Sequence, residues 1–338
     1  LRLAAALHCS VEDLFALAAR GEIIEGELIG DVPSAGRPLR VKVARIGKRV
    51  VVRPVASLGD VFTFTVPADG LMLGPVPGRR SRRVRVELLR DRQQVEDEVI
   101  VGGCDPAIVL TAEYLRRRDA KASVVGWTMG SAAALDALAR EEVHIAGVHV
   151  VDQKSGEHNL PYIKKRLGRQ DVTVVTFASW EEGLIVAARN PKSIRDAGDL
   201  ARKDVTIVNR EAGAGARHLL DRALAGAGVK ASSVKGYERH AASHVDVARM
   251  IAHREADAGI GIRSAAAVFG LDFIPLQTER YDLVMPTASL HAHRGVGQML
   301  DALVTRGFRA EIDALGGYDT SETGKIQSAP DRTAGGRT

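Results

Sequence analysis

The stretch from Val205 to Leu224 carries the clearest chemical signal in the sequence. It has the pattern of a buried strand, a glycine-containing loop and then an amphipathic helix. The first N–H groups of a helix have no partners inside that helix, and the helix dipole adds positive potential, so both attract anions. We therefore predict an anion pocket in this turn. Its members would be Asn209, Arg210, Gly213, Ala214, Gly215 and Arg217.

The two arginines flank the loop and are placed to add charge-assisted hydrogen bonds to an anion. We expect Arg217→Ala to abolish anion-induced thermal stabilisation and to leave the ligand-free fold intact. The alternative is a plain strand-to-helix turn with solvated arginines. A dinucleotide site is set aside, because His218 stands where the third glycine belongs and no strand-ending acid follows about twenty residues later.

Alternating strand and helix patterns begin near Val99 and place further polar residues at loops. Asp105, Thr128 and Ser131 each follow a predicted strand and precede a helix. Strands separated by helices imply a parallel sheet with right-handed crossovers, and such sheets bind ligands at the edge where their strands end. We expect Asp105 to cap a helix or hold an arginine, because a carboxylate repels an anion.

Residues 21–97 differ from the rest of the chain in charge and in pattern. Between Arg37 and Arg92 there are fourteen Lys or Arg and four Asp or Glu, so this segment carries +10 and the remainder −5 of the total +5. Short alternating strands, including 39–46, 49–53, 61–66 and 83–89, indicate a β-rich module. It would serve as a linker or a dimerisation element, and a homodimer is an expected partner. The basic loop offers DNA-backbone contacts through Arg79, Arg80, Arg82 and Arg83, with solvated strand faces as the alternative.

Composition narrows the class of protein. The 338 residues exceed the usual size of one domain, and the 45% hydrophobic and 26% charged content is that of a globular protein. No apolar run is long enough to span a bilayer. Cys9 and Cys104 lie far apart and form no CxxC pair, and no secretory signal is recognised, so we expect a cytoplasmic location.

Other reactive side chains give weaker signals. Cys104 sits at a helix start, which can activate a thiol, but no histidine is marked by spacing as its partner, so we expect a buried structural cysteine and no enzyme. His240 and His244 lie one helical turn apart without an evident third ligand, so we expect two exposed histidines and no metal site. His144 and His149 are predicted to face opposite sides of a strand. Trp127 and Trp180 are expected in the core.

The first residues resemble the end of a Cro/repressor-type helix-turn-helix domain. The resemblance is carried by Leu3, Ala4, Ala6, Leu7, Ser10, Leu14 and Phe15. The helices that such a domain inserts into the major groove are not present upstream. The resemblance therefore implies an N-terminally truncated reader, through a fragment or a wrongly placed start, with DNA as a partner through the missing part. The alternative is a generic helical hairpin.

A longer resemblance covers about 220 residues and points to the PBP-like effector domain, a cytoplasmic relative of periplasmic solute-binding proteins. Its motifs are 103–107, 130–135, 144–149, 209–217, 256–263, 281–284 and 317–321. It implies a two-lobed α/β fold of periplasmic-binding-protein type II. It also implies a molybdate- or tungstate-like oxyanion, or a molybdopterin-related compound, as ligand, with no cofactor. By this resemblance the cleft residues are Asp105, Thr128, Ser131, Asn209, Gly213 to Gly215, Arg217, Arg263 and Tyr281.

These interpretations give one organisation and one function. We expect a helical remnant at 1–20, the β-rich module at 21–97, a PBP-like domain at 98–325 and a disordered tail at 326–338. Lobe 1 would comprise 98–180 and 276–325, and lobe 2 would comprise 181–275, with hinges near 178–183 and 275–281. The predicted function is a one-component transcriptional regulator that senses an anion by lobe closure. The alternative is a solute-binding or molybdenum-cofactor-handling protein that does not bind DNA.

Overall fold

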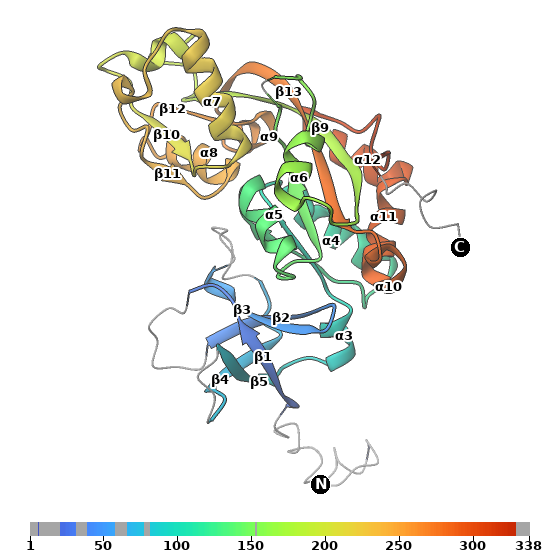
Figure 1. Ribbon diagram of the computed structural model, residues 1–338. Helices are drawn as coiled ribbons and strands as arrows, with labels where there is room; N and C mark the ends of the chain where they lie inside the picture. Colours follow the sequence, from blue (N-terminus) through green and yellow to red (C-terminus); the bar gives the residue numbers. More distant parts are fainter. Residues whose placement is uncertain are drawn as a thin grey trace.

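A computed structural model describes Ala6 and residues 21–31, 39–57, 66–77, 82–152 and 154–328. The structure has three parts: a small barrel, a first α/β lobe, and a second α/β lobe inserted between two segments of the first (Figure 1). The expected helix-turn-helix remnant, most of the expected strand 61–66, and Arg79 and Arg80 lie outside the described residues. Within the described part, no helix is both long and apolar enough to cross a lipid bilayer.

The β-rich module is a closed five-stranded barrel with the strand order β1-β3-β2-β4-β5. Antiparallel pairing of β1 with β5 closes it, and β1 pairs with β3 in parallel. Alternation of apolar and polar residues turns Val84, Val86 and Leu88 inward, as the sequence pattern predicts. The elements are β1 (Ile23–Leu28), β2 (Leu39–Ile46), β3 (Arg49–Pro54), η2 (Val55–Ser57), β4 (Gly70–Pro75), β5 (Arg83–Leu88) and α3 (Arg92–Glu96).

Lobe 1 is built on three parallel strands in the order β8-β6-β7, each followed by a helix. Three further helices from the end of the chain belong to the same lobe (Figure 1). The last two of these helices are α11 and α12, which begin at Arg294 and Arg306. The elements are β6 (Val99–Gly103), α4 (Ala107–Arg118), β7 (Val124–Thr128), α5 (Ser131–Ala139), β8 (Ile145–Val148), α6 (Leu160–Leu167), α10 (Ser289–Ala292), α11 (Arg294–Leu303) and α12 (Arg306–Asp313).

Lobe 2 repeats the strand-and-helix pattern around β11, β10 and β12, which pair in parallel in that order. Its core is formed by Leu219, Leu220 and Leu224 packed against Ile207 and Ile260. The elements are η4 (Ala197–Ala201), β10 (Ile207–Arg210), α7 (Gly215–Gly226), η5 (Ala231–Ser233), β11 (His240–Ala241), α8 (His244–Ala252), β12 (Ala258–Ile262) and α9 (Arg263–Val268).

Two long antiparallel strands, β9 (Val172–Val186) and β13 (Asp272–Pro286), run through both lobes. The end of β9 pairs with β12 of lobe 2, and the end of β13 pairs with β8 of lobe 1. Their mutual register shifts between Pro275 and Gln277 and again between Tyr281 and Asp282. These irregularities fall at the segment expected to hinge, so the connection between lobes is a pair of bulged strands.

Two short strands extend the sheet from the end of the chain: β14 (Tyr318–Asp319) and β15 (Ile326–Ser328) both pair with β9. The expectation that disorder starts at 326 is therefore wrong for Ile326–Ser328. The physical reason is that β9 offers backbone groups that these residues satisfy by pairing.

The barrel and lobe 1 share a continuous interior. Ile29, Ala44 and Val51 of the barrel belong to the same apolar cluster as Trp127 and Leu135 of lobe 1. A set of four charged residues lies at the same place, and we name it the charge cluster: Lys42, Asp69, Arg90 and Glu98. His144 adds a bridge, because its Nδ1 accepts from the Ile100 amide at 3.0 Å and its Nε2 lies 2.9 Å from the Arg45 carbonyl. Burial lowers the pKa of His144 to about 3, so the ring is neutral.

Candidate ligand site

The two lobes meet where their strands end and their helices begin. The Ala132 amide, in the first turn of α5, donates to the Gly213 carbonyl of lobe 2 at 3.3 Å. A Cβ atom added at Gly130 would lie 2.6 Å from Glu211 Oε1 and 3.1 Å from the Ala214 backbone. The loop predicted to bind an anion therefore faces lobe 1 directly.

The glycines of that loop allow the lobes to approach one another. Gly213 has φ +88°, and a Cβ there would lie 2.7 Å from Ala132 Cβ. A Cβ on Gly215 would lie 2.1 Å from the His149 carbonyl and 2.4 Å from its ring. We expected these glycines to make room for an anion. In this structure the space above Gly215 is instead taken by His149, because the lobes pack together here.

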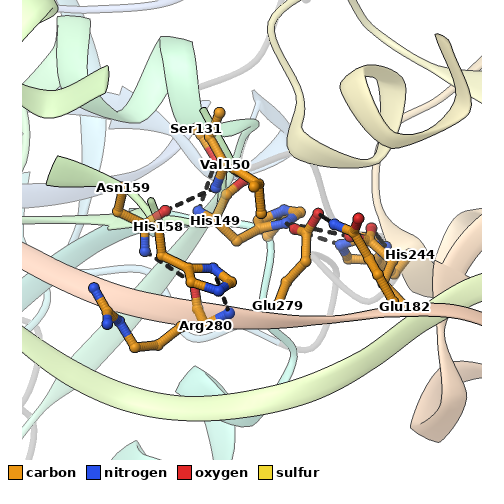
Figure 2. Close-up of polar contacts among 12 residues, drawn as sticks. Ser131, His149, Val150, His158, Asn159, Glu182, His244, Glu279 and Arg280 are labelled. Atoms are coloured by element: carbon orange, nitrogen blue, oxygen red, sulfur yellow. Dashed lines mark hydrogen bonds and ion pairs between the residues drawn. The ribbon is translucent and has the colours of Figure 1, made fainter. Parts of the chain in front are cut away.

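Six ionisable side chains are buried at this meeting point, and we name them the junction cluster. None is more than 5% exposed. The rings of His149 and His244 converge on the carboxyl groups of Glu182 and Glu279 (Figure 2). The members are Cys104 and His149 of lobe 1, Arg210 and His244 of lobe 2, and Glu182 and Glu279 of the two long strands.

His149 is the centre of the cluster. Its backbone amide donates to Ser131 Oγ at 3.1 Å, and that hydroxyl lies 3.3 Å from the His149 carbonyl, so Ser131 fixes the residue in place. The ring places Nδ1 2.7 Å from Glu279 Oε2 and Nε2 3.2 Å from Cys104 Sγ. Although burial opposes protonation, Cys104 and Glu182 raise the pKa of His149 well above its usual value.

The two glutamates are driven apart in pKa. Burial and the neighbouring Glu279 charge raise the pKa of Glu182 to about 8. Burial also acts on Glu279, but its contacts with His149 outweigh it and lower the pKa of Glu279 to about 2. Neither Glu182 oxygen has a hydrogen-bond partner among the described residues, and its closest imidazole nitrogen, His149 Nδ1, is 3.5 Å away. Such separation of two adjacent acids is typical of functional sites.

Arg210 is the buried cation of the cluster, with 1% exposure. Its guanidinium group is bonded to Glu211 through Nε at 3.0 Å and one terminal nitrogen at 3.1 Å. The other terminal nitrogen, Nη1, has no hydrogen-bond partner within the described part of the chain. A buried, unsatisfied donor on a cation is costly, and this one marks a place where an acceptor would be stabilised.

Several predicted site residues are buried at or near the junction in structural roles. Asp105 accepts from the Ala107 amide at 2.8 Å and the Tyr318 hydroxyl at 2.7 Å, in line with the expected helix cap, and burial raises its pKa to about 6. Asn209 donates to the Tyr237 carbonyl at 3.0 Å. Thr128 ends β7 and is partly buried. Tyr281 is fully buried, and its hydroxyl occupies the space that a Cβ at Gly103 or Gly147 would take.

Two predicted arginines are engaged elsewhere. Arg217 stacks on Tyr237, with 3.9 Å from its guanidinium carbon to the ring centre, and donates to the Arg210 carbonyl at 3.2 Å. Arg263 pairs with Glu181, stacks on Phe273 and lines a surface hollow of about 520 Å³. Of the predicted DNA contacts that are described, Arg82 bonds the Gly30 carbonyl and Arg83 lies 3.8 Å from Glu25.

One expectation about reactive side chains is confirmed and one is wrong. Cys104 is buried as expected, and the fold gives it histidine neighbours that spacing did not mark: Sγ lies 3.2 Å from His149 Nε2 and 3.5 Å from His244 Nε2. His244 is fully buried, while His240 is 42% exposed, so the two do not share an environment. His144 and His149 flank β8 (Ile145–Val148) and do not lie within the strand, so the expectation that they face its opposite sides does not apply. Both tryptophans are buried, as expected.

One signal in the sequence pointed to Cys104 and His149. Each follows the last residue of a parallel strand, β6 or β8, and such positions meet at one sheet edge. Glu182 and Glu279 had no such signal, because they lie inside long strands whose crossing of both lobes is a tertiary feature.

Two lobes joined by paired strands, with polar side chains converging between them, define a two-lobed ligand-binding fold. The family model described as "PBP superfamily domain" matches residues 112–304. The chain therefore belongs to the PBP superfamily.

The chain is also similar to individual proteins. The uncharacterized protein YvgK of Bacillus subtilis is 32% identical over 228 residues, which cover 68% of this chain and 73% of YvgK. A Clostridium pasteurianum protein, described as an uncharacterized protein in the ferredoxin 2Fe-2S gene 5' region, is 39% identical over 109 residues, covering 32% of this chain and 96% of that one. A phosphate-bound putative phosphate transporter substrate-binding protein of Clostridium perfringens superposes with a TM-score of 0.50 at 13% identity, covering 64% of this chain and 97% of that structure.

Proposed function

We propose that this chain is the sensor part of a cytoplasmic transcriptional regulator, in which the two lobes close on a small oxyanion and no reaction is catalysed. The observation that carries the proposal is the buried Arg210 at the lobe junction, whose Nη1 has no hydrogen-bond partner among the described residues. An oxyanion supplies the acceptor that Nη1 lacks.

Groups from the other lobe support the same ligand class. The helix α5 starts at Ser131 against the Gly213 loop, and its dipole favours an anion at that end. His149 carries a raised pKa and adds a second positive charge. Molybdate or tungstate is the proposed ligand, and phosphate is tested beside it because the Clostridium perfringens relative was solved with phosphate bound.

Anion binding is tested by calorimetry and thermal shift with molybdate, tungstate, sulfate and phosphate. We expect Arg210→Met to abolish anion-induced stabilisation, because it keeps the aliphatic packing and removes the charge. Arg217→Ala is the variant compared with Arg210→Met. Since Arg217 reaches the site only through the Arg210 carbonyl, it should weaken the response without removing it. If Arg217→Ala abolished the stabilisation and Arg210→Met only weakened it, Arg217 would be the residue that contacts the anion. If none of the four anions stabilised the wild type, the proposal would be rejected.

The regulatory half of the proposal is tested separately. A chain extended upstream with the preceding genomic sequence should shift DNA in a mobility assay, with and without the anion. Anion binding without any DNA shift would favour the second candidate, a solute-binding or molybdenum-cofactor-handling protein.

A further inference from the structure

We propose that Cys104, His149 and His244 form a binding site for a divalent transition-metal ion, zinc by its ligand set, with the fourth position open. The ligand atoms are Cys104 Sγ, His149 Nε2 and His244 Nε2. These three atoms lie within 4.8 Å of one another, and all three side chains are buried. The site shares His149 with the anion site proposed above but does not use Arg210, so the two ligands are tested separately.

The spacing of the three atoms fits tetrahedral coordination. Zinc binds thiolate sulfur at about 2.3 Å and imidazole nitrogen at about 2.0–2.1 Å, so tetrahedral angles put sulfur and nitrogen about 3.5 Å apart. The observed separations from Cys104 Sγ are 3.2 Å to His149 Nε2 and 3.5 Å to His244 Nε2. The side chains therefore need only small movements to coordinate an ion.

The far side of each ring gives a second, independent observation. Ligand histidines in proteins usually direct their other ring nitrogen to a carboxylate or carbonyl, which fixes the ring and its tautomer. His149 Nδ1 lies 2.7 Å from Glu279 Oε2, and His244 Nδ1 lies 3.9 Å from Glu182 Oε1. His244 Nδ1 and both Glu182 oxygens have no hydrogen-bond partner among the described residues. A metal on Nε2 fixes the ring proton on Nδ1, and a small closing movement would let His244 donate it to Glu182.

The chemistry of the ligands selects the kind of ion. A thiolate with two imidazoles suits zinc or copper, whereas magnesium and calcium prefer oxygen ligands. The same His149 ring also meets Glu182 and Glu279 at Nδ1, which makes an alternative, carboxylate-rich set. We assign the metal to the set of Cys104, His149 and His244. In this set both histidines are ligands through Nε2, and the Nδ1 atom of each faces a glutamate carboxylate.

Three buried acids, Glu182, Glu279 and Asp105, lie around the junction, and Arg210 is bonded to Glu211. A divalent ion bound beside these acids would favour their ionised forms. Because Cys104 and His149 belong to lobe 1 and His244 begins α8 of lobe 2, the ion would also fasten the lobes together.

The first test uses Co²⁺ as a spectroscopic probe of the full chain, stripped with a chelator and kept in buffer free of oxyanions. We expect one Co²⁺ per chain, a thiolate-to-cobalt charge-transfer band in the near ultraviolet, intense visible bands of tetrahedral cobalt, and displacement by Zn²⁺ but not by Mg²⁺. Zn²⁺ should also protect Cys104 from a thiol reagent. A wild-type protein with no such bands and no protection would overturn the proposal, whatever the outcome of the anion titrations.

Matched variants assign the ligands. Cys104→Ser should remove the charge-transfer band, whereas Cys9→Ser, at the chain's other cysteine, should keep it. His244→Gln should weaken Co²⁺ binding by about 100-fold or more. His253→Gln, at the exposed end of the same helix α8, should bind as the wild type does. Melting curves without metal establish that each variant folds.

Two results would refute the assignment. One is loss of the charge-transfer band in Cys9→Ser and not in Cys104→Ser. The other is equal Co²⁺ affinity of His244→Gln and His253→Gln.

Discussion

The chain buries two groups of charged side chains, and they differ in how their polar atoms are satisfied. In the charge cluster, Lys42 Nζ lies 2.7 Å from Asp69 and 2.8 Å from Glu98, and Arg90 reaches both acids. The Val43 amide and the Ser123 hydroxyl fill further positions on the two carboxylates. Glu98 Oε2 has no hydrogen-bond partner among the described residues, but its charge is paired with Lys42 Nζ 2.8 Å away. In the junction cluster, Glu182, His244 and Arg210 each keep polar atoms without a hydrogen-bond partner among the described residues.

This difference indicates that the charge cluster has a structural role and that the junction cluster has a binding role. Two cations face two anions in the charge cluster, so its desolvation is offset within the protein and the barrel is held to lobe 1. The junction cluster leaves part of its desolvation uncompensated, a cost that a bound ion or ligand would remove. Removing one member should therefore have opposite effects on stability in the two places.

The largest expected effect is at Lys42. Lys42→Met leaves Asp69 and Glu98 buried side by side with only Arg90 between them. Breaking a buried pair in this way costs about 3–5 kcal/mol of unfolding free energy. Denaturant unfolding measures it, with Lys48→Met in the exposed turn after β2 as the control. A loss no larger than that of the control would show that the charge cluster does not hold the interface.

The junction cluster predicts the opposite sign for Glu182. Glu182→Gln removes a buried acid that lacks hydrogen-bond partners among the described residues, so the metal-free and anion-free protein should gain about 1–3 kcal/mol. The matched control is Glu181→Gln on the other face of the same strand, where the acid pairs with Arg263 at the surface and the change should stay below about 1 kcal/mol. Destabilisation by Glu182→Gln would mean that this acid is satisfied within the protein alone.

His144 gives the interface of barrel and lobe 1 a dependence on pH. Its pKa is about 3 in the folded chain because burial disfavours the charged ring, whereas an unfolded histidine titrates near 6.5. The unfolded chain therefore binds the proton first, so stability is complete above pH 6.5 and falls as the pH drops toward 3. Between pH 6.5 and 5 the loss is about 2 kcal/mol.

The measurement is the difference between the unfolding curves of wild type and His144→Gln over this pH range. The variant should lose less stability between pH 6.5 and 5. Taking the difference also removes the contribution of Asp69, whose pKa, raised by burial and Glu98 to about 6, gives a slope of the opposite sign. Parallel curves would mean that His144 does not carry the dependence.

Much of the fold could be predicted from local patterns. Strands with alternating or continuous apolar residues, such as 39–46 and 99–103, appear where the sequence predicts them, and the glycine loop does join β10 to α7. The motifs that resemble the PBP-like domain also led to the two-lobed architecture, which the family match supports.

The chemistry of the junction was less accessible, because it depends on contacts over long sequence separations. Cys104 and His244 are 140 positions apart, and His149 and Glu279 are 130 apart, so no spacing rule joins them. The arginines were harder still. Arg210 and Arg217 flank the same loop, yet only the fold decides that Arg210 turns into the protein while Arg217 lies on Tyr237.

The smallest expected effect lies at the rim of the barrel interface. Arg53 holds its guanidinium carbon 4.7 Å from the centre of the Trp127 ring and donates from Nε to the Ser57 carbonyl at 3.2 Å. Burial lowers the pKa of Arg53, which means that desolvation of the guanidinium group opposes its cation–π attraction to the indole ring. Arg53→Met keeps the stem on the indole, and we expect a loss of about 0.5–1 kcal/mol in denaturant unfolding. Arg85→Met, on an exposed position of β5, should cost less. If Arg53→Met lost nearly as much unfolding free energy as Lys42→Met, the contact of Arg53 with Trp127 would hold the barrel to lobe 1 as strongly as the charge cluster does.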